Sequence, residues 1–166
     1  MTPASPDGEF AIDDPRAADV GALLASHLAF AHANTAPGEV YALDVEALLD
    51  PAITFFGFRR QGALLAVGAL KRLDAEHAEL KSMHTAAAMR GRGIGRAMVE
   101  HLLAVARNRG FRRVSLETGS TPPFAPARAL YEGVGFEPCG PFGDYPPNPN
   151  SAFMTLRLDE GDRATT

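Results

Sequence analysis

The chain has 166 residues, 46% of them hydrophobic and 22% charged, a composition typical of a single globular domain with a proper core. Twenty acidic residues against sixteen basic ones give a net charge of −4, which argues against a dedicated nucleic-acid binder. One cysteine excludes an intramolecular disulfide, and the lack of a secretory signal or of an apolar run near the ~20 residues that cross a bilayer predicts a cytoplasmic protein without membrane partners.

The N-terminal part of the chain predicts one short strand and two helices. After a polar tail over residues 1–8, the segment Glu9–Asp13 is predicted as a strand. From Pro15 to about Ala33, apolar residues recur at helical spacing, and proline suits a first helical turn. Residues 44–49 predict a second, short helix with an aspartate as its N-cap.

An antiparallel meander is predicted in the middle of the chain. Its three strands are Ile53–Phe58, Ala63–Leu70 and Ala78–Thr85. Gly62 marks the first hairpin turn, and a polar turn around Asp74-Ala75-Glu76 marks the second.

The rest of the chain alternates helices and strands. Residues 94–109 form the clearest amphipathic helix. The segments that follow it are predicted as a strand, a short helix and two final strands: Arg113–Glu117, Pro126–Gly133, Phe136–Cys139 and Ala152–Leu158. Strands 78–85 and 113–117 flank the long helix in a β-α-β unit, so they should be parallel. We therefore predict one α/β (α+β) domain over residues 9–158, with a mixed, mostly antiparallel sheet, and a tail over residues 159–166.

The most informative motif is the glycine-rich turn Arg90-Gly91-Arg92-Gly93-Ile94-Gly95-Arg96, directly before this helix. Glycines let backbone N–H groups approach a ligand closely, and a helix N-terminus adds unpaired donors and a partial positive charge. Arginines in the same turn supply donors suited to phosphate. The turn is therefore interpreted as a cradle for a diphosphate.

Two other glycine-loop motifs fit this turn less well. A Walker-type loop needs Lys-Ser or Lys-Thr after its last glycine, where the chain has Arg96-Ala97. The dinucleotide fingerprint would need a glycine at position 96, although Glu117 stands where a ribose-binding acid is expected. A nicotinamide-dependent reductase stays open as an alternative.

The pattern Arg-x-x-Gly-x-Gly over Arg90–Gly95, followed later by Ala129-Leu-Tyr-Glu-Gly-Val-Gly-Phe136, resembles the two signature motifs of the GNAT superfamily of acyl-CoA-dependent N-acetyltransferases. The resemblance covers roughly residues 9–158, and the loop Gly140–Asn150 is similar to loops of a bacterial subgroup. It implies a six- to seven-stranded sheet with a central, splayed parallel pair and about four flanking helices. It also implies acetyl-CoA as co-substrate, direct transfer to a primary amine of a small molecule or peptide, and a homodimer as one option.

The resemblance assigns the cofactor to the gap between strands 78–85 and 113–117. The backbone of the first strand would pair with the pantetheine arm as an added strand does, and the glycine-rich turn would hold the diphosphate. The implied cofactor-binding residues are Met83, His84, Thr85, Arg90, Gly91, Arg92, Gly93, Ile94, Gly95 and Arg96. Many members carry an asparagine where Phe124 stands, and Ser120 and Arg128 are candidates to replace it.

Tyr131 matches the family's usual general acid, because a phenol with a pKa of ~10 is protonated at neutral pH and can donate to a departing thiolate. The alternative is that Tyr131 only packs. Glu79 stands where many members carry a base or a water-positioning group, and Glu117 on the facing strand competes for this role. Either carboxylate could instead pair with Lys81 as a structural charge.

The loop Gly140–Asn150 combines aromatic residues, an acid and prolines. It could wall the acceptor pocket, with Asp144 attracting an amine and Phe142 or Tyr145 packing on it, or simply be a stiff connection. Glu117 is a further candidate for contact with substrate. The five histidines lack metal-ligand spacing, so no metal site is predicted. A non-catalytic acyl-CoA-binding module, the identity of the amine and an acyl group longer than acetyl stay open.

Overall fold

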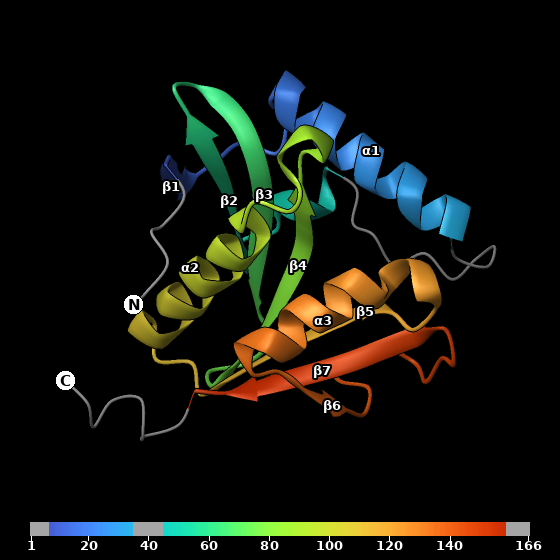
Figure 1. Cartoon of the computed structure of the whole chain (residues 1–166). Helices are drawn as coiled ribbons and strands as arrows, with labels where there is room; N and C mark the ends of the chain where they lie inside the picture. Colours follow the sequence, from blue (N-terminus) through green and yellow to red (C-terminus); the bar gives the residue numbers. More distant parts are fainter. Residues whose placement is uncertain (1–6, 35–44, 159–166) are drawn as a thin grey trace, which may run out of the picture.

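Seven strands form one mixed sheet, with helices on both of its faces (Figure 1). The computed structural model describes residues 7–34 and 45–158, without the side chains of residues 27–34. In sheet order, the strands are β1 (Glu9–Ile12), β2 (Ile53–Arg60), β3 (Ala63–Arg72), β4 (His77–Thr85), β5 (Arg113–Gly119), β7 (Ser151–Arg157) and β6 (Glu137–Cys139). The α-helices of the described residues are α1 (Ala18–Asn34), α2 (Ile94–Asn108) and α3 (Ala125–Val134), and the 3-10 helices are η1 (Ala47–Leu49), η2 (Ala87–Met89) and η3 (Pro122–Phe124).

The predicted mixed sheet is confirmed. Strands β1 to β4 pair antiparallel as a meander, β4 and β5 pair parallel, and β7 pairs antiparallel with both β5 and β6. Helix α2 connects the two parallel strands, as the β-α-β prediction requires. The resemblance implies about four flanking helices, and the described ranges contain three α-helices.

The short helix predicted over residues 44–49 is replaced by the single 3-10 turn η1 within the described residues. Asp50, which ends it, is extended (φ −55°, ψ 133°), because the proline that follows disfavours helical backbone at this position. So short a segment also gains too few hydrogen bonds to offset the cost of helix nucleation. The predicted tails lie outside the described residues, except for Asp7 and Gly8.

Local chemistry sets both turns of the meander. Gln61 and Gly62 have φ values of +50° and +83°, the left-handed backbone that a tight two-residue hairpin requires. In the second turn, the carboxylate of Asp74 accepts hydrogen bonds from the N–H groups of Glu76 and His77, both at 2.8 Å. The strands of the meander are thereby held in a fixed register.

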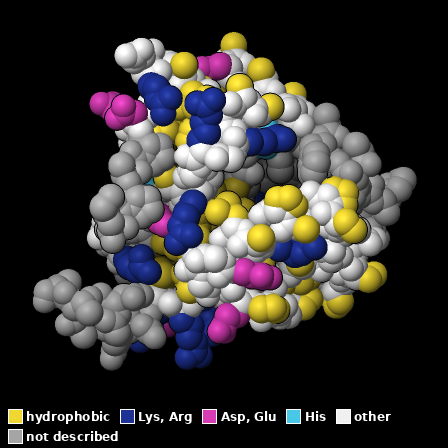
Figure 2. All heavy atoms as spheres, viewed as in Figure 1, with side chains coloured by type: hydrophobic (Ala, Val, Ile, Leu, Met, Phe, Trp, Pro, Cys, Tyr) yellow, Lys and Arg dark blue, Asp and Glu magenta, His cyan; other side chains and the backbone are white. Residues whose placement is uncertain are grey.

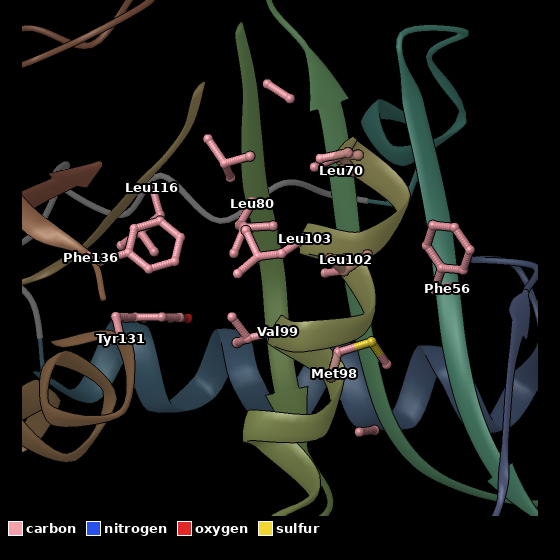
Figure 3. Packing of buried hydrophobic residues seen from close by; sticks show 14 of the residues in the cluster. Phe56, Leu70, Leu80, Met98, Val99, Leu102, Leu103, Leu116, Tyr131 and Phe136 are labelled. Carbon is pink, nitrogen blue, oxygen red and sulfur yellow. The ribbon is translucent and has the colours of Figure 1, made fainter. Parts of the chain in front are cut away.

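Alternate strand residues feed two hydrophobic clusters, one on each face of the sheet. On one face, Phe56, Leu80 and Leu116 pack in a cluster with Met98 and Leu102 of α2 (Figure 3). The cluster on the other face, which α1 covers, contains Val20, Leu48, Phe55, Val67 and Ala69. The helix that carries the glycine-rich turn is therefore fixed to the sheet by its buried side.

Strands β4 and β5 separate partway along their length. Their parallel pairing ends at Leu80 and Leu116, whereas β4 continues to Thr85 and β5 to Gly119. A β-bulge interrupts the β3–β4 register beside this point, and Ser82 there has φ +56°. Beyond Leu80, no strand among the described residues pairs with the edge of β4 that faces β5.

Candidate active site

A cleft of about 620 Å³ opens where β4 and β5 separate. Its walls are the end of β4, the turn before α2, the start of α2, the end of β5, η3 and α3. Figure 2 shows the molecule from the side of α2 and α3, where Lys and Arg side chains stand at several places on the surface. All the predicted cofactor-binding residues line this cleft except Arg92, which is exposed and is not part of the lining.

The glycine-rich turn has the backbone geometry of an anion cradle. Gly91 and Gly93 have φ values of +76° and +80°, and a Cβ at either residue would meet no atom within 4 Å. Glycine is therefore required there by conformation, not by lack of space. Gly93 caps α2, so the first N–H groups of the helix, which have no partner within the helix, point into this region. The turn can hold a diphosphate group.

Two arginines of the turn also line the cleft. Arg90 is exposed and lies directly before the glycines. Arg96 donates from Nε to Glu100 Oε1 at 2.8 Å, one helical turn further on, and both side chains are more than half exposed. An exposed ion pair of this kind is weak, so it leaves Arg96 available to an anionic ligand.

The open edge of β4 forms another wall of the cleft. Met83, His84 and Thr85 line it, while their strand is paired with β3 on its opposite edge. Backbone N–H and C=O groups on such an edge can bind an extended ligand that carries amides, as an added strand would. Pantetheine, the arm of coenzyme A, is a ligand of this kind.

Tyr131 lies at the inner side of the cleft. Its side chain extends from α3 toward Val99 of α2, and its ring packs edge to face against Phe136 at 5.8 Å between ring centroids (Figure 3). The residue is 7% exposed, and burial raises its pKa to about 12. Its hydroxyl therefore stays protonated at every physiological pH and can act only as a proton donor.

Glu79 is sealed inside the protein. It is 2% exposed and does not line the cleft. Its Oε2 accepts hydrogen bonds from Lys81 Nζ at 2.9 Å and from the Tyr145 hydroxyl at 2.6 Å. Lys81 Nζ also donates to that hydroxyl at 2.9 Å, which closes a compact network of three side chains.

Glu117 is the carboxylate that borders the cleft. It lies just beyond Leu116, at the first position where β5 is no longer paired with β4. Its pKa is raised from 4.5 to about 7, chiefly because burial desolvates the carboxylate; Ser151 and Lys81 lower it, and the nearby charge of Glu79 adds to the rise. A carboxyl group with such a pKa can gain and lose a proton near neutrality.

The loop between β6 and β7 packs on the face of the sheet that carries Glu79. Phe142 and Tyr145 contact each other and both contact Phe153 of β7, with ring centroids 5.3 to 5.9 Å apart. Asp144 is exposed. Of the four predicted substrate contacts, only Glu117 lines the cleft, and the three loop residues lie outside it.

Much of the apolar lining of the cleft was not predicted from the sequence. It includes Val67, Leu80, Met89, Met98, Leu116, Pro123, Phe124, Pro126, Ala127 and Leu130. Met98 could have been found, because it follows Ile94 by one turn on the buried side of a helix that begins at the glycine-rich turn. The residues of η3 carried no such signal, because they border the cleft only through the tertiary fold.

No three His, Cys, Asp or Glu side chains of the described residues are grouped so that they could hold a metal ion. None of the helices in the same part of the chain is both long and apolar enough to cross a membrane.

Comparison with known proteins agrees with this geometry. The model of the acetyltransferase (GNAT) family matches residues 23–136. The uncharacterized N-acetyltransferase YsnE of Bacillus subtilis (strain 168) is 43% identical over 147 residues, which cover 89% of this chain and 97% of that protein.

Solved structures give the same fold. A protein of Klebsiella pneumoniae assigned as an acyl-CoA N-acyltransferase has a TM-score of 0.74 and 25% identity, with 92% of this chain and 99% of that one covered. A Bacillus subtilis acetyltransferase solved in complex with CoA has a TM-score of 0.69 at 14% identity, with the same coverage of both chains. The glycine-rich turn, the separated parallel strands and these matches lead to one conclusion: the chain belongs to the acetyltransferase (GNAT) family.

Proposed function

We propose that the protein transfers an acetyl group from acetyl-CoA to a primary amine of a small molecule or peptide, by direct attack of the amine in a ternary complex. The broader class, an N-acetyltransferase that uses acetyl-CoA, follows from family membership. The observation that carries the proposal is that a strand edge, a glycine-rich helix start and a buried phenol all border one cleft.

The residues of the cleft fit acetyl-CoA along its length. The turn over residues 90–96 would hold the diphosphate through backbone N–H groups and through Arg90 and Arg96. The open edge of β4 over residues 83–85 would hold the pantetheine arm. When bound, acetyl-CoA supplies an acetyl group activated as a thioester.

We assign Glu117 as the group that accepts the proton of the amine. It borders the cleft, and its pKa of about 7 lets it be ionised at neutral pH and still bind a proton. Glu79, the first candidate from the sequence, is closed off by Lys81 and Tyr145 and lies outside the lining. We therefore assign the role of base to Glu117.

We assign Tyr131 as the general acid. Its hydroxyl holds a proton in the apolar inner part of the cleft and can deliver it to the departing sulfur. The surroundings that raise the pKa of this phenol also raise the pKa of a thiol beside it, because both anions lose hydration there. The proton affinities of donor and acceptor therefore shift together.

The acceptor is proposed as an amine that is at least partly deprotonated when it meets Glu117. Nothing in the lining demands an acceptor with several charges, which is why small molecules and peptides both stay in the proposal.

A coenzyme A thioester as donor and a chain with one cysteine both support the expected cytoplasmic location.

The test is an acetyl-CoA assay across a panel of amines, namely amino acids, polyamines, peptides and aminoglycosides, with free thiol release as the readout. Turnover that depends on one amine class supports the proposal. Stabilisation by acetyl-CoA without turnover on any amine would favour a non-catalytic binding module instead. Thermal stabilisation by NADH or NADPH, and none by acetyl-CoA, would overturn the proposal in favour of a reductase.

A further inference from the structure

The wall of the cleft that faces β4 is built from residues 119–127, between the end of β5 and the start of α3. Pro123, Phe124, Pro126 and Ala127 of this segment line the cleft. Three prolines lie between positions 122 and 126 and fix φ at their positions. The wall is thus an apolar surface on a stiff backbone.

Within this segment, Phe124 packs against Gly119. A Cβ on Gly119 would overlap the ring of Phe124, so the aromatic ring lies directly against the backbone of the glycine. Phe124 in turn lines the cleft. Any movement of the backbone at the end of β5 would therefore move the ring that borders the ligand.

Arg128 holds this backbone from α3. Its Nη1 donates to the carbonyl oxygen of Gly119 at 2.6 Å and to that of Thr121 at 3.0 Å, and both hydrogen bonds are partly buried. Hydrogen bonds from a charged donor are the stronger kind. Arg128 itself is not part of the lining of the cleft, so it acts on the wall from behind.

The same stretch of backbone is fixed from the opposite side by Ser120. Its N–H donates to the carbonyl oxygen of Asn150 at 3.0 Å, and its hydroxyl donates to that of Pro149 at 2.7 Å. The two carbonyl groups that Arg128 binds flank this serine. Ser120 and Arg128 therefore both fix the turn between β5 and η3 through hydrogen bonds.

We propose that Arg128 is a positioning residue for coenzyme A, which holds the Gly119–Phe124 wall in place so that the pantetheine arm meets a preformed apolar surface. A wall that is already ordered spares the ligand the cost of ordering it on binding. The inference rests on the proposed function, because it takes the cleft to be the coenzyme A site.

The experiment compares the affinity for CoA of wild type, Arg128→Met and Arg128→Lys by calorimetry. Methionine keeps an apolar stem and removes the donors, and we expect its dissociation constant to rise about tenfold. Lysine keeps donors on a flexible stem, and it should recover most of that loss. Arg112→Met is the matched control, because it removes the same charge from an exposed residue at the other end of β5.

A double-mutant cycle with Phe124→Ala tests the route of the effect. If Arg128 acts through the ring, Arg128→Met should cost much less affinity in the Phe124→Ala background than in wild type. Equal losses in both backgrounds, or a loss that vanishes at high salt as a direct phosphate contact would, overturn the inference. Wild type that fails to bind CoA refutes the proposed function itself, whereas wild type and Arg128→Met that bind equally well refute only the role of Arg128.

Discussion

The hydroxyl of Tyr145 donates a hydrogen bond of 2.6 Å to Glu79, across 66 positions of sequence. The same carboxylate oxygen binds the ammonium group of Lys81 at 2.9 Å. The carboxylate of Glu79 is thus bound by a residue of the β6–β7 loop and by a residue of its own strand. This leaves Glu117 as the carboxylate that faces the cleft, and the two residues should respond to mutation in opposite ways.

Replacing Glu117 with Gln should remove the base and keep the fold. We expect kcat to fall about 10²- to 10⁴-fold, which is the usual contribution of a general base. In wild type, kcat/KM should rise with pH through about 7, because the carboxyl group must be ionised to accept a proton. The measurement is a pH–rate profile from 5.5 to 9, and a wild-type profile that is flat around pH 7 would remove Glu117 from the mechanism.

The same substitution should stabilise the protein above pH 7. The pKa of Glu117 is raised from 4.5 to about 7 in the folded state, so the folded state binds more protons than the unfolded chain between these values, and its stability falls as pH rises through this window. Above pH 7 the folded state must hold an ionised carboxylate that is poorly hydrated, which lowers its stability. Glutamine carries no charge and removes this penalty. We expect a Tm higher by on the order of a few °C at pH 8, and a difference close to zero at pH 5. Equal shifts at both pH values would contradict the linkage.

Replacing Glu79 with Gln should mainly destabilise the fold. It leaves Lys81, which is 9% exposed and borders the cleft, without its counter-ion, and breaking a buried ion pair typically costs about 3–5 kcal/mol. The free energy of unfolding from urea titration measures this loss. In the folded variant the rise of kcat/KM with pH should persist but move to somewhat lower pH, because the charge of Glu79 contributes to the raised pKa of Glu117. If the rise disappears while the fold survives, Glu79 and not Glu117 is the base.

Tyr131→Phe should separate catalysis from binding. The ring and its packing on Phe136 are kept, while the proton donor is lost, so kcat should fall about 10²- to 10⁴-fold with little change in the KM for acetyl-CoA. Because the pKa of Tyr131 is about 12, wild type should show no loss of rate from this residue up to pH 10. Tyr145→Phe is the matched control, since its hydroxyl lies outside the cleft and its removal should lower stability more than rate.

Gly93→Ala should weaken acetyl-CoA binding through the backbone alone. Gly93 has φ +80°, and a left-handed conformation costs a residue with a Cβ about 1–2 kcal/mol. The turn should therefore relax away from the geometry that holds the diphosphate. Gly21→Ala is the control, because Gly21 lies in α1 with open space around it, and alanine there should stabilise the protein by about 0.4–1 kcal/mol. Unchanged acetyl-CoA affinity in Gly93→Ala would refute this position for the diphosphate.

The meander, the parallel pair of strands and the glycine-rich turn could be predicted because their signals are local. The glycines around Ile94, followed by an amphipathic helix, predict a helix start with a ligand site, and this turn lines the cleft. Alternation along β4 also indicates that Glu79 and Leu80 face opposite sides of the sheet. Which carboxylate is accessible could not be predicted, since that depends on Tyr145, which only the folded loop brings to Glu79.

Other features of the site arise from irregular backbone. The bulge at Ser82, with φ +56°, shifts the residues after it, and a regular strand period cannot anticipate such a shift. The contact of Phe124 with Gly119 similarly depends on how η3 folds back onto the end of β5. In both cases the sequence contains the residues, whereas the geometry comes from long-range packing.

The free edge of β4 beyond Leu80 has a consequence for selectivity. Its N–H and C=O groups would satisfy any extended chain of amides, including a short peptide, as readily as the arm of coenzyme A. Discrimination must then come from the other walls of the cleft: charge recognition at the arginine-bearing turn, and the apolar surroundings of Tyr131. Extended peptidomimetics with an anionic terminus are accordingly the class of inhibitor to which this cleft is most open.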